Sequence, residues 1–238
     1  MSTLVLDIET IGEDFEQMDD VTKRMLTRWV KNGSLGAEEQ EREIENVKNG
    51  LGFSPLTGQV VAIGMLDYEK NKSAVYFQAP GETLGNFEEN GVMYKQMTEV
   101  EMLEAFWRVC ENYDQFVTFN GRGFDAPFLA IRSAIHKIKP SKDLLSNRYL
   151  GMQKFGAKHF DLQDLFTFYG STMRRPSLHL ACRAFGIVSP KVEGVDGDDV
   201  TRLFAEKKFL DIARYNVRDI VATKELYAYW EQYMKFER

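Results

Sequence analysis

LVLDIET, at residues 4–10, places two carboxylates at the end of an apolar run. Residues 3–8 combine apolar and β-branched side chains over a short length, which predicts a strand. Side chains two apart on a strand point to the same face, so Asp7 and Glu9 are expected to meet one site. Hard divalent cations such as Mg²⁺ prefer oxygen ligands, and burying two like charges without a cation would be costly.

The Asp-x-Glu spacing alone is weak evidence for a metal site, because the chain contains it elsewhere. Asp14 and Glu16 have the same spacing, as do Asp67 and Glu69 after an equally apolar run. We expect Asp67 and Glu69 to lie in a solvated hairpin turn, since the residues around them are strongly polar and lead into another strand.

Strand and helix patterns are mixed along the chain. Further strands are predicted at residues 59–66, 73–78, 115–119 and 157–161, the first two of these joined as a hairpin. Helical periodicity predicts helices at residues 99–112, 127–136, 161–169, 177–185, 198–206 and 208–235. This mixture predicts a single α/β domain spanning residues 1–238, with a mixed sheet flanked by helices.

Residues 13–56 interrupt that pattern after the first strand. Apolar side chains recur there at helical spacing, and again after an NGSLG break, which predicts an inserted helical hairpin. The favoured interpretation is that its apolar stripe packs on the core; a lid over substrate and a subunit contact are the alternatives. The first half of the stripe consists of Phe15, Met18, Val21, Met25 and Trp29.

A second acidic pattern, FNGRGFDAPF, occupies residues 119–128. An apolar strand ends at Asn120, two glycines allow a tight turn, and Asp125 follows at the start of a helix. The simplest interpretation is that Asp125 caps the helix. A functional interpretation places its carboxylate beside the first strand. Asn120 could then offer an amide to a terminal nucleotide, and Phe124 could stack on a base.

The third pattern, RYNVRD at residues 214–219, contains Tyr215 and Asp219. Residues four apart on a helix share a face. A phenol at this position could orient or deprotonate a water that a metal held by Asp219 has acidified. The alternative is an aromatic core residue followed by a surface acid.

Together and in this order, the patterns resemble the motifs of the DEDD family of 3′-5′ exonucleases in its tyrosine subtype. That family carries DxE on its first strand, an Asp within NGxxFD after a later strand, and YxxxD on a late helix. The chain is similar over nearly its whole length to the predicted exonucleases related to the proofreading domain of family-B DNA polymerases. Further segments that carry this similarity are GFSPLTGQVVAIG (52–64), SLHLACRAFG (177–186) and KVEGVDGDDV (191–200).

The resemblance implies an RNase H-like fold and a metal-dependent 3′-5′ exonuclease that releases nucleoside 5′-monophosphates. Asp7, Glu9 and Asp219 would hold the tighter of two divalent ions, Mg²⁺ or Mn²⁺. Asp7 would bridge to the second, which Asp125 holds partly through water, roughly 3.5–4 Å away. Tyr215 would position the nucleophilic water. Single-stranded DNA is the expected substrate; an exoribonuclease and a catalytically silent nucleic-acid-binding or repair-complex module are the alternatives.

The resemblance also implies that the 3′-terminal nucleotide contacts Thr10, Asn120 and Phe124. Arg174 and Arg175 are paired in a predicted loop, which suits contacts to phosphate.

The histidine subtype of the same family places an Asp five residues after a His. His159 and Asp164 have this spacing and would make His159 the catalytic base. The tyrosine pattern is favoured because it lies on the long final helix. We therefore expect Asp161 and Asp164 to cap and decorate a helix start.

Composition constrains the function less than the motifs do. The net charge of −6 argues against a non-specific nucleic-acid binder, but carboxylates that hold metal cations would also make the net charge of the chain negative. Two distant cysteines favour neither a disulfide framework nor a zinc site and suit the cytoplasm. No P-loop, signal peptide or membrane span is expected, and the sequence does not identify any protein partners.

Overall fold

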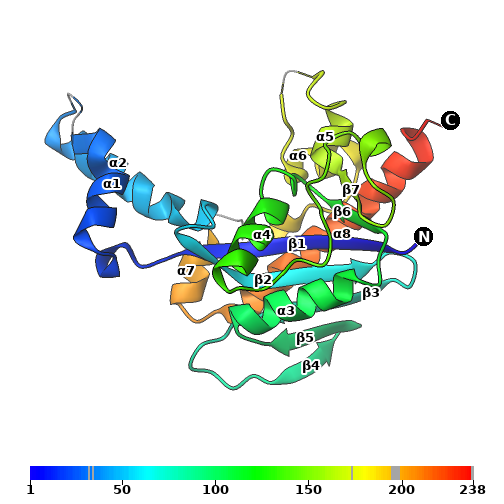
Figure 1. Ribbon diagram of the computed structural model, residues 1–238, viewed down its shortest axis with the longest axis horizontal. Coiled ribbons are helices and arrows are strands. Elements are labelled where there is room, and N and C mark those ends of the chain that lie inside the picture. Colours follow the sequence, from blue (N-terminus) through cyan, green and yellow to red (C-terminus); the bar gives the residue numbers. More distant parts are fainter. Residues whose placement is uncertain (32, 34, 173, 194–198, 237–238) are drawn as a thin grey trace.

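A mixed sheet of seven strands runs through the centre of the computed structural model, in the order β4-β5-β3-β2-β1-β6-β7 (Figure 1). The structure describes residues 1–31, 33, 35–172, 174–193 and 199–236. The strands are β1 (Thr3–Gly12), β2 (Gly58–Asp67), β3 (Lys72–Phe77), β4 (Asn86–Glu89), β5 (Val92–Gln96), β6 (Gln115–Thr118) and β7 (Lys158–Asp161).

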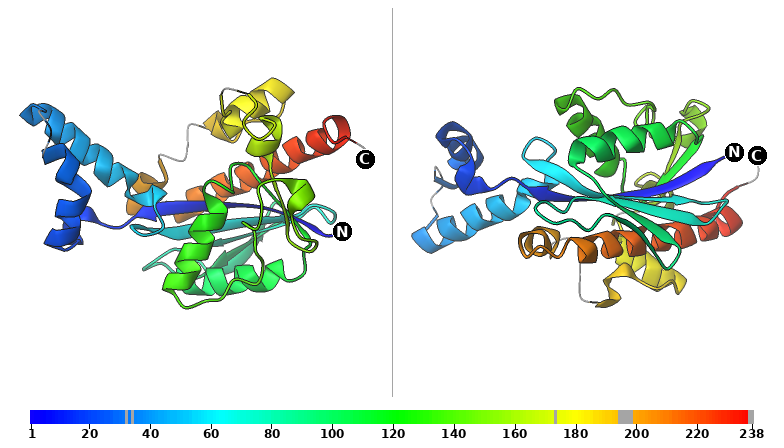
Figure 2. Two further views of the ribbon diagram at one scale, coloured as in Figure 1. Left: turned by 45° about the horizontal axis from the view of Figure 1, so that its top comes forward. Right: turned by 90° about the horizontal axis from the view of Figure 1, so that it is seen from below.

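Helices cover both faces of this sheet (Figure 2). The α-helices are α1 (Asp20–Lys31), α2 (Ala37–Gly50), α3 (Glu99–Cys110), α4 (Asp125–Ile135), α5 (Leu162–Phe166), α6 (Leu178–Phe185), α7 (Val200–Ala205) and α8 (Phe209–Tyr233). Short 3₁₀ turns are η1 (Phe15–Gln17), η2 (Leu51–Phe53), η3 (Leu150–Met152) and η4 (Pro190–Glu193). Helices α3 and α4 pack on one face, and α8 runs along the other. The predicted α/β class with a mixed sheet is confirmed.

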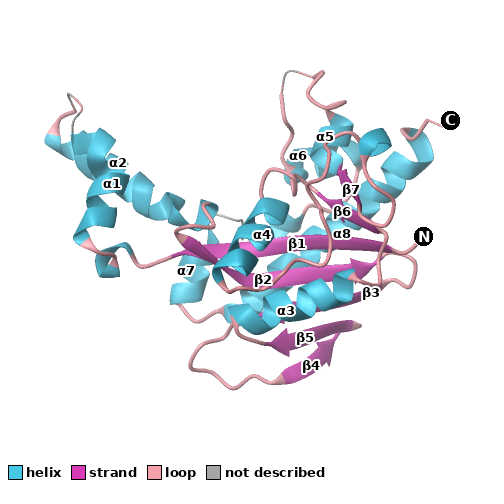
Figure 3. Cartoon of the chain, in the orientation of Figure 1, coloured by secondary structure: helices cyan, strands magenta, loops and turns pink. Residues whose placement is uncertain are grey.

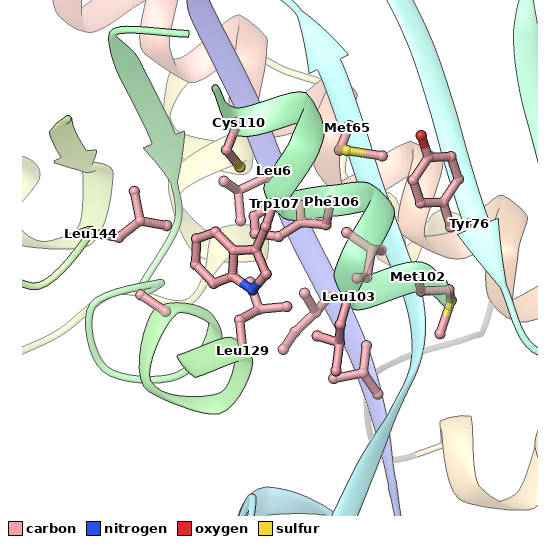
Figure 4. Packing of buried hydrophobic residues seen from close by; sticks show 14 of the residues in the cluster. Leu6, Met65, Tyr76, Met102, Leu103, Phe106, Trp107, Cys110, Leu129 and Leu144 are labelled. Atoms are coloured by element: carbon pink, nitrogen blue, oxygen red, sulfur yellow. The ribbon is translucent and has the colours of Figure 1, made fainter. Parts of the chain in front are cut away.

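Strand β1 lies inside the sheet between β2 and β6, antiparallel to β2 and parallel to β6. Its side chains alternate between the two faces. Leu4, Leu6 and Ile8 pack with α3 and α4, where Figure 4 shows Leu6 beside Phe106 of α3. Val5 packs on the other face, against α8. The same alternation turns the odd-numbered acidic residues of β1 towards α8.

The sheet contains a hairpin, β4–β5, that was not among the predicted elements. Its two-residue turn is Asn90-Gly91, and both residues have positive φ, 50° and 78°. An Asn-Gly turn of this kind is the strongest short-range hairpin signal, so the sequence did contain the information. Strand β4 was overlooked because NFEE carries only one apolar side chain.

The inserted helical hairpin between β1 and β2 is confirmed as α1 and α2, but its predicted packing on the core is wrong. The hairpin projects away from the sheet (Figure 3). Val21, Met25 and Trp29 are 58%, 65% and 56% exposed. Helical periodicity shows only that a helix has an apolar face and does not show what covers it. The hairpin is anchored at its base, where Leu51 is buried.

No helix in the described ranges is both long enough and apolar enough to cross a membrane. Cys110 and Cys182 are both buried as free thiols.

Candidate functional site

Three carboxylates meet between β1 and α8. Asp7, Glu9 and Asp219 each offer one oxygen, and these oxygens lie within 4.8 Å of one another. The pairing of β1 with β2 shifts register between Glu9 and Thr10, a bulge of the kind that re-aims side chains beside active sites. The prediction that Asp7 and Glu9 share one face of a strand is confirmed.

Helix α8 turns Tyr215 and Asp219 inward. Tyr215 is 5% exposed and Asp219 is 6% exposed, so the alternative of a surface acid is wrong. One turn of helix brings the two side chains to the same face, as their spacing predicts.

Asn216 of α8, which was not among the predicted site residues, links that helix to the two carboxylates of β1. Its side chain is fully buried, and Nδ2 donates to Asp7 Oδ2 at 2.8 Å and to Glu9 Oε1 at 3.5 Å. Opposite it on β2 stands Gly64, where a Cβ atom would overlap Asn216 Oδ1. Gly64 therefore makes room for the amide that holds the two β1 carboxylates.

We expect Gly64→Ala to displace Asn216 and to lower both stability and activity. Overpacking of this kind costs roughly 1–3 kcal/mol of unfolding free energy. Chemical denaturation and a nuclease assay of the same preparation would measure the two effects. Gly36→Ala is the matched control, because a Cβ atom there meets nothing within 4 Å. A fully active Gly64→Ala protein would contradict the role given to Asn216.

Asp125 approaches the cluster from the opposite side of β1. It is the first residue of α4 and is 3% exposed. Its Oδ1 accepts a hydrogen bond from the backbone N–H of Ile8 at 3.0 Å. Pairing of β1 with β6 ends at Val5, which leaves that N–H free for Asp125. The alternative that Asp125 serves only as a helix cap is wrong, because its carboxylate binds β1.

The turn before Asp125 is held by Asp161, the residue that caps α5. Asp161 accepts hydrogen bonds from the backbone N–H groups of Asn120 and Arg122, both at 2.9 Å, as well as from Gln163 at 3.0 Å. Asn120 has a φ of 64°, a conformation that Asn tolerates better than most residues. The predicted capping role of Asp161 is confirmed, and the same carboxylate also fixes the loop that presents Asp125.

Burial and mutual repulsion oppose ionisation of the clustered carboxylates. Burial raises the pKa of Asp125 and the pKa of Asp219 to about 7. Burial, followed by the charges of its acidic neighbours, also raises the pKa of Asp7 well above its ordinary value. The pKa of Glu9 rises for the same two reasons, with Asp219 as the main neighbouring charge. Burial and these carboxylates raise the pKa of the Tyr215 phenol as well.

The donor set fits a hard divalent cation. Asp219 Oδ1 is buried and has no hydrogen-bond partner among the residues that the structure describes. An unpaired buried oxygen of this kind is costly, and a cation would satisfy it. Three carboxylate oxygens from Asp7, Glu9 and Asp219 supply ligands of the type that Mg²⁺ and Mn²⁺ prefer.

The residues predicted to bind substrate lie at different distances from this cluster. Thr10 and Phe124 border a cavity that begins at Glu9. The Thr10 hydroxyl already donates to the Gly52 carbonyl at 2.7 Å. Asn120 lies in the turn before Asp125, half-buried, while Arg174 and Arg175 are exposed in a loop.

The histidine-subtype residues make other contacts. His159 is 1% exposed, and its Nδ1 donates to the Leu144 carbonyl at 2.9 Å. Its Nε2 therefore accepts from the Thr118 hydroxyl at 2.8 Å. Burial lowers the pKa of His159, so the ring is a neutral part of the core. Asp164 binds Arg148 through two hydrogen bonds.

Asp67 and Glu69 lie away from the cluster, near the start of β1, because Asp67 pairs with Leu4. The predicted solvated turn is wrong for Asp67, which is 7% exposed. It accepts from the Lys70 backbone at 2.8 Å and from the Tyr113 hydroxyl at 2.9 Å. Glu69 accepts from the backbone N–H of Thr3 at 2.9 Å. The two carboxylates therefore stabilise strand ends, Asp67 at the end of β2 and Glu69 at the start of β1.

Comparisons with known proteins identify the family of the chain and support its fold. Residues 58–237 match the model of a family described as a predicted 3′-5′ exonuclease related to the exonuclease domain of PolB. That match begins after β1, so it does not include Asp7 and Glu9 or the inserted hairpin.

The family B DNA polymerase from the hyperthermophilic archaeon Pyrobaculum calidifontis has a similar structure, with a TM-score of 0.56 and 17% sequence identity. The similarity covers 97% of this chain and 24% of the polymerase chain, so the chain spans about a quarter of that protein's length. At this identity the similarity shows the fold alone, which is the RNase H-like fold of polymerase exonuclease domains.

Proposed function

Because the chain belongs to the family of predicted 3′-5′ exonucleases related to the exonuclease domain of PolB, we propose that it removes nucleotides from the 3′ end of single-stranded DNA. The products would be nucleoside 5′-monophosphates. The observation that carries the proposal is the cluster of Asp7, Glu9 and Asp219, each of which offers one oxygen within 4.8 Å of the other two. Asp219 also has a buried oxygen, Oδ1, with no hydrogen-bond partner among the described residues.

The acidic residues of the proposed site would hold two metal ions. Asp7, Glu9 and Asp219 would hold one divalent ion, and Asp125 would help Asp7 to hold a second. When bound, Mg²⁺ or Mn²⁺ ions would stabilise charge on the attacking and leaving oxygens of the phosphodiester. Asn216 orients Asp7 by its 2.8 Å hydrogen bond. We therefore assign the proposed site to the tyrosine subtype of DEDD exonucleases.

Other side chains would bind the DNA strand. The backbone around Thr10 and the side chains of Asn120 and Phe124 would contact the 3′-terminal nucleotide. Arg174 and Arg175 would contact phosphates further along the strand, where two guanidinium groups suit bidentate binding.

The direct test is degradation of 5′-labelled single-stranded DNA and RNA oligonucleotides with Mg²⁺, Mn²⁺ or EDTA. We expect a ladder that shortens from the 3′ end of DNA and is absent in EDTA. Preferential degradation of RNA would identify an exoribonuclease on the same site. A folded protein that degrades neither strand in either metal would refute the proposal and favour a catalytically silent binding module.

Tyr215→Phe is expected to lower kcat by about 100-fold, the scale of a lost proton-handling group, because its hydroxyl would orient the attacking water. Metal titration should be unchanged, since the phenol is not a proposed ligand. Tyr227→Phe, on the same helix, is the matched control; its hydroxyl bonds to Glu231 at 3.2 Å, away from the cluster. Equal rates for the two variants would remove Tyr215 from the proposed mechanism.

A further inference from the structure

A cavity of about 500 Å³ opens directly beside the carboxylate cluster. Its volume lies in the roughly 300–1,000 Å³ range of small-molecule sites. One side is formed by the end of β1 and by Phe124, and the other side by the inserted hairpin, through the end of α2 and η2. The insertion therefore reaches the site with its base, although its outer half projects away from the sheet.

Hydrogen bonds and close packing hold the base of the insertion against β1 and against the residue before β2. The Thr10 hydroxyl donates to the Gly52 carbonyl at 2.7 Å, and the Thr57 hydroxyl donates to the Leu51 carbonyl at 2.8 Å. Gly52 and Gly12 approach so closely that a Cβ atom on Gly52 would lie 3.0 Å from the Gly12 nitrogen. These contacts fix η2, and with it Phe53, relative to Glu9.

The cavity wall carries the chemistry that nucleobases bind. Phe53 is 60% exposed and, together with Phe124, borders the space with an aromatic ring. Phe124 is backed by Phe128, with ring centroids 5.5 Å apart. Aromatic rings of this kind provide stacking surfaces for bases.

Two amides complete the wall. Asn46 and Asn49 are three residues apart on α2, so they share a face, and both border the cavity. Both residues are exposed, so their amides are accessible to a molecule that enters the cavity. An amide both donates and accepts, which matches the edge of a base. Among the described residues that line the cavity, Glu9 alone is charged, so the space suits a neutral base better than a phosphate.

We propose that this cavity binds the base of the 3′-terminal nucleotide, with Phe53 stacking on the base and Asn46 and Asn49 contacting its edge. The inference rests on the proposed exonuclease function and extends it, because it makes the inserted hairpin the element that selects the terminal base.

Binding can be measured without cleavage by using the proposed product. The probe is the 5′-monophosphate of 2-aminopurine deoxyriboside, in Mg²⁺, whose fluorescence is quenched on stacking. We expect Phe53→Ala to bind it about 5- to 150-fold more weakly, because loss of one stacking ring costs about 1–3 kcal/mol. Leu56→Ala is the matched control, since Leu56 is 71% exposed in the same loop and does not border the cavity. Equal affinity of wild type and Phe53→Ala would overturn the proposal.

The same variants separate this proposal from the proposed function. With a 5′-labelled oligonucleotide, Phe53→Ala should raise KM by a similar factor. The double variant Asn46→Ala and Asn49→Ala should reduce the differences in KM among the four 3′-terminal bases. If the wild type cleaves and these KM values are unchanged, the base pocket is wrong and the exonuclease stands. If the wild type does not cleave but Phe53-dependent quenching remains, the pocket stands and the exonuclease is wrong.

Discussion

An Asp219→Asn variant is expected to lose nuclease activity by at least about 1,000-fold while its metal-free form becomes more stable than the wild type. A loss of that size corresponds to about 4 kcal/mol of transition-state stabilisation. It follows from the position of Asp219, which completes the three-carboxylate cluster. Its Oδ1 is buried and has no hydrogen-bond partner among the described residues. Asparagine has nearly the same shape but lacks the charge that would hold the cation.

The gain in stability has a separate cause. Burial raises the pKa of Asp219 to about 7, so its ionised form costs folding free energy above that pH. Each pKa unit corresponds to about 1.4 kcal/mol. Because the neighbouring carboxylates titrate together, removal of one of them recovers only part of the total cost. We therefore expect the free energy of unfolding to increase by about 2 kcal/mol at pH 8. Urea denaturation in EDTA would measure it. Since the variant is more stable, loss of activity could not be attributed to unfolding.

Asp67→Asn provides a control with the opposite expected result. Asp67 is also a buried acid, but although burial raises its pKa, the hydrogen bonds from Lys70 and Tyr113 lower that pKa below its usual value. Its replacement should reduce stability and leave nuclease activity near that of the wild type. Loss of activity in Asp67→Asn, or full activity in Asp219→Asn, would contradict the assignment of the site.

Local periodicity explains which parts of the site could be predicted. Asp7 and Glu9 share a face because strands repeat every two residues, and Tyr215 and Asp219 share one because helices repeat nearly every four. Both relations hold wherever the elements are placed. Neither period shows that the strand and the helix meet; the order of the three acidic patterns and their resemblance to the motifs of a known family led to their interpretation as one site.

The residues that were missed depend on tertiary packing. Asn216 lies within the third pattern, but its role requires α8 to cross β2 at Gly64, a contact that no local period indicates. Asp161 was predicted as a helix cap, and its second role requires β7 to lie beside β6. The exposure of the apolar face of α1 was missed for the same reason, since a periodic stripe does not identify what it packs against.

Stability of the metal-free protein is expected to fall as pH rises from about 5 to 8, and divalent metal should reverse that fall. The four acidic groups have folded pKa values above their unfolded values of 3.8 and 4.5. The folded state therefore binds more protons than the unfolded state across this range, so the unfolding free energy decreases with pH. His159 is buried and neutral in the folded state, so its own contribution makes the unfolding free energy increase with pH below its ordinary pKa of 6.5.

Comparison with Asp219→Asn removes the histidine contribution, because both proteins contain His159. Thermal unfolding in EDTA should show a shallower pH dependence for the variant. Mn²⁺ at about 100 times its Kd should stabilise the wild type by roughly 2.7 kcal/mol, or about 5–10 °C in Tm for a chain of this size. The increase should be larger at pH 8 than at pH 5, where protons compete for the carboxylates. A wild type whose Tm does not respond to Mn²⁺ at pH 8 would show that the cluster holds no such ion, and that its buried charges need another explanation.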